Sequence, residues 1–218
     1  MRNRPTHFGA SFGFSKGQQE ALSAVLISGI LIGVVGSVYF WGVPLIQKNK
    51  DVSILETSES FMRQLDEKIR SVANNGGRDH IVIPVPGIVS FDGETIRLTI
   101  ETQGTIYASD AEIPLGRNTL GSLTQSGTQY YGKWGVDDPV IFNVKSIKMG
   151  ENNYRNEYTL NYIELRNSKS LRDFKIGLTG SGASGGQDKT IIIENQGDTT
   201  TASGGRTLIS SSVKISIV

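Results

Sequence analysis

The feature that most constrains this chain is an apolar run at residues 21–46 that contains no Asp, Glu, Lys or Arg. As an α-helix rising 1.5 Å per residue, the run would span roughly 39 Å, more than the ~30 Å hydrocarbon core of a bilayer. A core helix of a soluble protein rarely stays apolar on every face for so long. The run therefore predicts a membrane-spanning helix, with Tyr39, Phe40 and Trp41 near one interface and a kink at Pro44.

Charge is distributed unevenly around this run. Residues 1–17 carry Arg2, Arg4 and Lys16 and no acid, whereas the rest of the chain holds 19 basic and 21 acidic side chains. Basic residues before a membrane helix favour a cytoplasmic N-terminus, which predicts a single pass with an extracellular C-terminal domain. The net charge of only +1 lacks the basic field that nucleic-acid binding needs, so no nucleic-acid partner is expected.

Small residues recur every four positions within the apolar run, at Gly29, Gly33 and Ser37. They would share one helix face and allow another helix to approach closely, although small residues are also common in membrane helices generally. A secretory signal cleaved after Ser37 is an alternative interpretation. Continuation of the apolar run to residue 46 and the acidic Glu20 at its start argue against that alternative.

Residues 47–75 change to an amphipathic helical pattern. Apolar side chains spaced by seven, four, four and three residues form one predicted packing face: Ile54, Phe61, Leu65, Ile69 and Val72. The Asn-Asn-Gly-Gly sequence at 74–77 ends the helix. We expect one long helix that continues from the apolar run, the alternative being a separate amphipathic helix after an unrelated anchor.

Residues 78–218 are expected to form an antiparallel β-rich domain, which makes the fold class α+β. Ile81, Ile83 and Val85 alternate, as do residues 96, 98 and 100, and the turn at 91–94 predicts that these two runs form a hairpin. Pro84 and Pro86 favour an edge position for the first strand. Further strands are expected at 140–147, 157–165, 174–178, 190–194 and 213–218, the last holding the C-terminus in a sheet.

Motifs for catalysis and metal binding are weak. The Gly/Ser-rich segment 180–185 matches a dinucleotide fingerprint and overlaps a nucleophile-elbow string, but a strand pattern follows it, so we expect a flexible loop. A Ser184–His80 hydrolase is a minor alternative, and Asp137-Asp138 is a minor cation candidate. With no cysteine and two histidines, we predict no enzyme, no metal site and no cofactor. Aromatic residues 130, 131 and 134 suggest core packing or an adhesive or subunit-contact patch.

The string Lys16-Gly17-Gln18 directly before the apolar helix resembles the processing site of archaeal type IV pilins and archaellins. The resemblance implies a class III signal peptide, residues 1–17, removed after Gly17 by a prepilin-type peptidase. It further implies that residues 18–46 stay as the filament core and that residues 47–75 continue the helix. An assembly role for Glu20 follows less directly, because it would be third in the mature chain, whereas bacterial pilins carry Glu at the fifth position.

The same resemblance implies a pilin-like partner set. The precursor would lie in the lipid bilayer and then polymerise with copies of itself, aided by the type IV pilus assembly machinery, into a surface filament capable of adhesion. Gly29, Gly33 and Ser37 would contact neighbouring helices. The alternative function is a monomeric membrane-anchored surface binding domain, or a minor accessory pilin that does not polymerise.

Overall fold

The computed structural model describes residues 16–108, 110–127, 129–180 and 182–218. One helix, α1 (Lys16–Asn75), includes both the expected apolar segment and its amphipathic continuation. The chain divides into two compact units, Met1–Gln47 and Lys48–Val218, here called unit 1 and unit 2. Arg2 and Arg4 of the expected leader lie outside the described residues. Pro44 lies inside the helix.

Helix α1 ends where glycine permits a backbone reversal. Gly76 and Gly77 both have positive φ angles, of 74° and 87°. The Gly76 N–H donates to the Val72 carbonyl at 2.9 Å, which satisfies one of the carbonyls at the helix end. The Asn195 side-chain amide donates to the same carbonyl at 3.0 Å, so the end of α1 is also held by the sheet.

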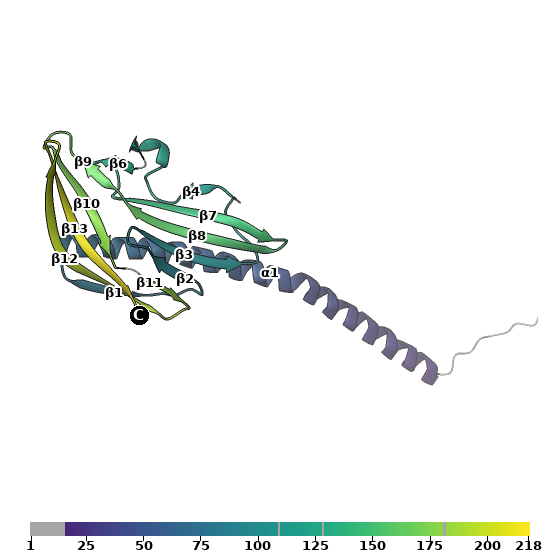
Figure 1. The fold of residues 1–218 in the computed structure, drawn as a ribbon. Coiled ribbons are helices and arrows are strands. Elements are labelled where there is room, and N and C mark those ends of the chain that lie inside the picture. The colour runs from purple at the N-terminus through teal and green to yellow at the C-terminus, as the bar shows by residue number, and fades with distance from the viewer. Residues whose placement is uncertain (1–15, 109, 128, 181) are drawn as a thin grey trace, which may run out of the picture. The chain divides into compact units, whose positions relative to one another are not determined.

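Unit 2 contains two sheets that lie along the C-terminal part of α1 (Figure 1). The strand order is β1-β12-β13-β10-β9-β6-β5 in the first sheet and β11-β2-β3-β8-β7-β4 in the second. A short 3-10 helix, η1 (Leu120–Ser122), precedes β5. The strands are β1 (Arg78–Val82), β2 (Ile88–Phe91), β3 (Thr95–Thr102), β4 (Glu112–Pro114), β5 (Thr124–Ser126), β6 (Gln129–Lys133), β7 (Val140–Gly150), β8 (Asn153–Tyr162), β9 (Glu164–Arg166), β10 (Arg172–Thr179), β11 (Gly182–Gly185), β12 (Thr190–Ser203) and β13 (Arg206–Ile217).

One main hydrophobic core joins α1 to both sheets. It contains Phe61 and Leu65 from the helix, Ile191 and Ile215 from the first sheet, and Leu160 from the second, all at most 2% exposed. A smaller cluster, built around Leu123, Ile141, Ile163 and Leu165, lies apart from it. The helix and the sheets therefore cover each other's apolar surfaces, and the α+β class is confirmed.

Most strand pairs are antiparallel, as expected, but two are parallel. Strand β10 runs parallel to β13, and β6 runs parallel to β9. The first sheet is therefore mixed. The C-terminal strand β13 is paired on both sides, with β12 and β10, so the expectation that the chain ends within a sheet is confirmed.

The predicted hairpin between the run at residues 81–85 and the run at residues 96–100 is wrong, because these two runs do not pair with each other. The segment with Ile81, Ile83 and Val85 does alternate, and all three side chains are buried. However, β1 pairs with β12, and it stops at Val82, ahead of Pro84 and Pro86. Proline has no backbone N–H to donate to a neighbouring strand, so the chain leaves the first sheet before Pro84. Strand β1 lies at the edge of that sheet, as the two prolines predicted.

The turn expected at 91–94 exists, but it joins β2 to β3. Asp92 Oδ1 accepts from the backbone N–H groups of Glu94 and Thr95 at 3.2 and 2.8 Å, and Gly93 has φ +97°. Gly87 begins this second segment. A Cβ added there would lie 2.8 Å from the Thr99 carbonyl oxygen, so only glycine allows this close approach of the chain to β3.

The Gly/Ser-rich segment was expected to be a flexible loop, and that prediction is wrong for residues 182–185. They form β11, which adds to the edge of the second sheet by antiparallel pairing with β2. Pairing at an edge needs only backbone N–H and C=O groups, so a sequence with weak β-propensity can form it.

Candidate assembly and membrane surface

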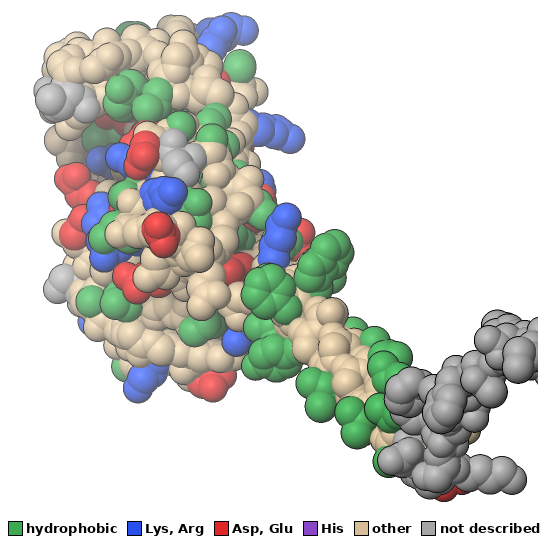
Figure 2. All heavy atoms as spheres, turned by 90° about the vertical axis from the view of Figure 1, so that its right-hand side faces the viewer, with side chains coloured by type: hydrophobic (Ala, Val, Ile, Leu, Met, Phe, Trp, Pro, Cys, Tyr) green, Lys and Arg blue, Asp and Glu red, His purple; other side chains and the backbone are tan. Residues whose placement is uncertain are grey.

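Unit 1 presents a helix whose apolar side chains are exposed. Leu, Val, Ile and aromatic side chains from Leu22 to Ile46 are 46–84% exposed, with Phe40 and Trp41 among the most exposed. Figure 2 shows these hydrophobic side chains gathered along the helix. Within the described residues, α1 alone is long and apolar enough to cross a membrane. Exposed apolar surfaces of this extent commonly mark sites of contact with lipid or with other protein.

The small residues of the expected helix-packing face are open to an approaching partner. A Cβ added at Gly29 or Gly33 would meet no other atom within 4 Å. The Ser37 hydroxyl donates to the Gly33 carbonyl at 2.8 Å, so this polar group is satisfied within its own helix. Such internal bonding suits apolar surroundings, in which an unpaired hydroxyl would be costly.

The expected processing residues lie at the start of α1. The helix begins at Lys16, so the Gly17–Gln18 peptide bond falls in its first turn. Glu20 follows in the next turn, with an exposed side chain. The structure thus places this short string directly before the exposed apolar surface.

In unit 2, α1 buries the face that contains the expected packing residues. Phe61 is 2% exposed, Leu65 and Ile69 are fully buried, and Val72 is 4% exposed. Ile54, at the start of the stripe, is only partly buried. The buried face is wider than the predicted stripe, since it also includes Asp51, Leu55, Ser58, Met62, Asp66 and Ala73.

Sequence spacing contained a signal for part of this wider face. Leu55, Met62 and Ile69 are seven residues apart and form a second apolar row beside the predicted one. Ser58 and Asp66 gave no such signal, because they are polar. Ser58 is accommodated by donating its hydroxyl to the Ile54 carbonyl. Asp66 depends on partners that come from elsewhere in the fold.

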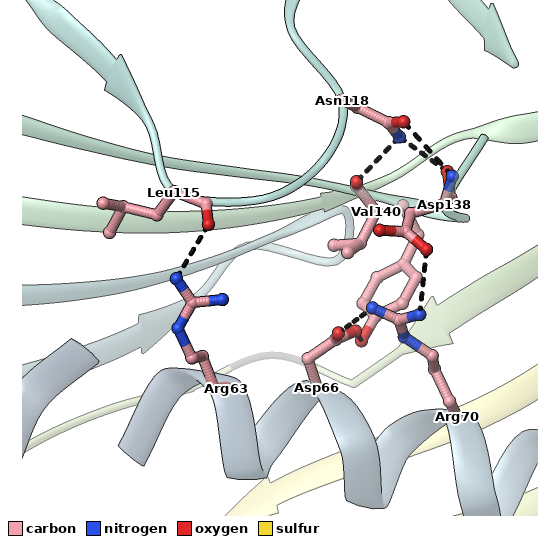
Figure 3. A network of polar contacts seen from close by, with 8 residues as sticks. Arg63, Asp66, Arg70, Leu115, Asn118, Asp138 and Val140 are labelled. Carbon is pink, nitrogen blue, oxygen red and sulfur yellow. Dashed lines mark hydrogen bonds and ion pairs between the residues drawn. The ribbon is translucent and has the colours of Figure 1, made fainter. Parts of the chain in front are cut away.

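Asp66 is the centre of a buried polar cluster on α1 (Figure 3). Its carboxylate accepts hydrogen bonds from the Arg70 guanidinium and from the Tyr162 hydroxyl, the latter at 2.7 Å. Arg70 also pairs with Asp138 at 3.5 Å. Asp66 is only 6% exposed, and its carboxylate is compensated by a charge and by hydrogen bonds.

The same cluster extends to the segment that follows β4 and to the start of β7. Asn118 donates through its amide to the carbonyls of Asp138 and Val140, at 2.6 and 3.0 Å. Arg63 donates to the Leu115 carbonyl at 2.8 Å (Figure 3). These bonds attach the segment after β4 to both α1 and the second sheet.

Electrostatics keep the two donors to Asp66, the Tyr162 phenol and the Arg70 guanidinium, protonated. Burial raises the pKa of Tyr162 far above its ordinary value, and the adjacent Asp66 carboxylate raises it further, so the phenol remains a donor. Burial opposes the charge on Arg70, but the hydrogen bond and the charge of Asp66 outweigh it and raise the Arg70 pKa. Both shifts preserve the donors that hold the Asp66 carboxylate, so this cluster acts as a structural clamp.

A groove of about 760 Å³ lies over this cluster. Its lining includes Arg63, Arg70 and Arg117 together with Asp66, Glu67 and Asp138. The opposite charges are equal in number, so the groove offers no net field for a charged ligand.

The residues of the hydrolase alternative lie in different sheets, and those of the cation alternative have other partners. His80 lies in β1 of the first sheet, whereas Ser184 lies in β11 of the second. Asp137 accepts from the Lys133 backbone N–H at 2.6 Å, and Asp138 is paired with Arg70. No group of three potential His, Cys, Asp or Glu ligands occurs among the described residues.

The aromatic residues near β6 are partly packed. Tyr130 packs against the smaller hydrophobic cluster. The guanidinium carbon of Arg166 lies over the Tyr131 ring, 3.4 Å from the ring centroid. Trp134 stacks on Phe174 with ring centroids 4.1 Å apart, yet it remains 46% exposed.

Comparison with known proteins gave no relatives: no protein-family model, curated protein or solved structure matches this chain.

Proposed function

We propose that this chain is a structural subunit of an archaeal type IV pilus-like surface filament. It enters the membrane as a precursor, is processed after Gly17 by a prepilin-type peptidase, and polymerises through its apolar helix. The observation that carries the proposal is the exposed apolar part of α1 in unit 1, in a chain whose unit 2 has a complete core of its own. Such a helix needs lipid or copies of itself as its surroundings.

The physical argument identifies which residues direct assembly. Lipid tails are as apolar as Leu or Ile, so moving the helix from a bilayer into a filament gains little from the hydrophobic effect. Association then depends on close packing, for which the open face of Gly29, Gly33 and Ser37 is suited. In this proposal Glu20 is the third residue of the mature chain and takes part in assembly.

The mass of the mature protein tests processing. Cleavage after Gly17 leaves a chain that begins with Gln18 and retains the entire apolar helix. A mature chain beginning near Val38 would instead indicate an ordinary secreted protein, and the proposal would fail.

Electron microscopy of cells that express helix variants tests assembly. Gly33→Leu places a bulky side chain on the small-residue face and should abolish filaments while the protein still inserts in the membrane. Val34→Leu is the matched control, because a neighbouring position points about 100° away around the helix. Normal filaments with Gly33→Leu would refute the packing role. Absence of filaments with the unmodified chain would favour the monomeric anchored binding domain or a minor accessory subunit.

A further inference from the structure

The hairpin of β7 and β8 ends in an exposed tip that combines an apolar and a basic side chain. This hairpin tip, residues 148–153, is exposed throughout. A bulge between Lys148 and Gly150 leaves Met149 without a partner on β8. Met149 is 52% exposed. Because bulges commonly re-aim a side chain, a large apolar group here, beside a lysine, indicates a contact surface.

Hydrogen bonds to α1 fix the direction in which the hairpin tip points. The Tyr158 hydroxyl, on β8, donates to the Leu55 carbonyl at 3.0 Å. Four residues further along β8, the Tyr162 hydroxyl donates to Asp66 at 2.7 Å. Strand β8 therefore runs alongside α1 in the same direction, and the hairpin tip points toward the N-terminal end of unit 2 (Figure 1).

The hairpin tip extends past Lys48, the first residue of unit 2. Lys48 precedes Leu55 by seven residues, which is roughly 10 Å along a helix. Asn152, in the hairpin tip, precedes Tyr158 by six residues, which is roughly 20 Å along an extended strand. Since Leu55 and Tyr158 are bonded to each other, the hairpin tip projects about 10 Å beyond the level of Lys48.

Unpaired lysines gather at this end of unit 2. Lys48 and Lys50 are exposed on α1, and Lys148 is exposed on the hairpin tip. None of the three forms an ion pair within the part of the chain that the structure describes. Glu151 is the single acid of the hairpin tip. The surface therefore offers three free ammonium groups beside one exposed methionine.

The apolar run indicates what lies next to these lysines. It ends at Ile46, two residues before Lys48, so the two Cα atoms are at most about 7 Å apart. The headgroup layer on each side of a bilayer core is roughly 5–7 Å thick. A bilayer that holds the run therefore brings Lys48 to its headgroups. Anionic headgroups attract each lysine near the surface, which complements the charge of this end of unit 2.

We propose that Lys48, Lys50, Lys148 and Met149 form a docking surface for anionic lipid headgroups of the bilayer that holds the apolar run. The ammonium groups pair with lipid phosphates, and the Met149 side chain packs at the boundary between headgroups and acyl chains. The hairpin tip thus gives unit 2 a second attachment to the membrane besides the helix. The inference rests on the membrane insertion that the proposed function includes, and not on polymerisation.

Fluorescence quenching of the full-length protein in lipid vesicles tests the proposal. The chain has no cysteine, so Met149→Cys and Ser170→Cys each provide one site for an apolar fluorophore. Ser170 is the control position, because it lies in the exposed turn between β9 and β10, beyond the end of β8 that is opposite to the hairpin tip. A nitroxide attached to phosphatidylcholine headgroups quenches only labels that reach the headgroup layer.

Two lipid compositions and two charge variants separate the contributions. The vesicles contain phosphatidylcholine alone or phosphatidylcholine with about 30% phosphatidylglycerol, an anionic lipid. In the Met149→Cys chain, Lys148→Gln removes one ammonium group from the docking surface, and Lys169→Gln removes one from the exposed control turn. Flotation of the protein with the vesicles after a carbonate wash measures membrane insertion separately.

We expect the label at position 149 to be quenched strongly in the anionic vesicles and the label at position 170 to be quenched little. Lys148→Gln should lower the ratio of docked to undocked molecules about fivefold, the change that corresponds to one lysine near an anionic surface. Lys169→Gln should leave the ratio unchanged. Quenching at position 149 should weaken in phosphatidylcholine alone, and also in about 1 M salt, which screens charges beyond roughly 3 Å.

The outcomes that overturn the proposal are distinct from failure of the proposed function. Equal quenching at positions 149 and 170 in protein that floats with the vesicles would exclude the contact and leave the proposed function intact. Equal quenching at position 149 in both lipid compositions, or equal effects of Lys148→Gln and Lys169→Gln, would exclude recognition of anionic headgroups. Protein that does not float with the vesicles would overturn membrane insertion, and with it both proposals.

Discussion

Replacing Phe61 with alanine should destabilise unit 2 strongly, because this side chain joins the helix to the sheet core. Phe61 is 2% exposed and belongs to the main cluster that contains residues from α1 and from both sheets. Truncating the ring to a methyl group removes the contacts that Phe61 makes within this shared core.

The magnitude follows from the buried area. A buried phenylalanine removes at least 150 Å² from water, and at about 25 cal/mol per Å² this corresponds to roughly 4 kcal/mol. Alanine retains part of that burial, whereas the cavity left behind adds a penalty. We therefore expect a loss of about 3–5 kcal/mol in the free energy of unfolding, which is the usual range for Phe→Ala in a core.

Urea unfolding of a chain comprising residues 48–218 measures this loss. Trp134 is the only tryptophan in that segment, and its emission reports on the β-rich unit. The unfolding midpoint should fall with an unchanged m-value, and the thermal midpoint should fall by about 2–4 °C for each kcal/mol.

Val136→Ala is the control, because Val136 is 67% exposed and its truncation should change stability by less than about 0.5 kcal/mol. A loss under about 1 kcal/mol for Phe61→Ala would refute the reasoning. It would mean that the helix stands apart from the sheets in solution and that the shared core does not exist there.

Two further substitutions test polar contacts. The Arg206 guanidinium donates to Asp173 at 2.6 Å, and this hydrogen bond lowers the pKa of the Asp173 carboxyl. The ionised carboxylate therefore stabilises the fold at pH values above the unfolded pKa of about 4. The stabilisation is lost as the pH falls through the lower pKa of the folded state. Asp173→Asn should therefore lower the urea midpoint more at pH 7 than near pH 2, and an equal deficit at both would contradict this. Tyr162→Phe removes the bond to Asp66 and should cost about 1.5–3 kcal/mol by the same assay. The control Tyr154→Phe should cost under about 0.5 kcal/mol, and an equal loss in both variants would exclude a specific role for the bond.

Local sequence patterns determined the elements whose signals lie within a few neighbouring residues. The long helix follows from the apolar run and from the Phe61, Leu65, Ile69 spacing, and its end follows from the glycines at 76 and 77. The alternation of Ile81 and Ile83 and the Asp92 turn were likewise readable. The helix and the alternating run depend on the spacing of apolar residues, and the helix end and the turn depend on residues that let the chain reverse. Both are properties of short segments.

Only the tertiary structure decided which strands pair. Strand β1 pairs with β12, more than a hundred residues away, and β10 and β13 run parallel. Residues 182–185 add to β2 through backbone groups alone. Backbone pairing is nearly blind to side-chain type, so the choice of partner is set by how the core packs and leaves no local signal.

The candidate sites divide in the same way. The exposed apolar helix and its small-residue face were visible in the sequence, because a continuous apolar run and a spacing of four residues are patterns of a short segment. The burial of Asp66 was not visible, since the carboxylate is tolerable only where Tyr162 and Arg70 reach it.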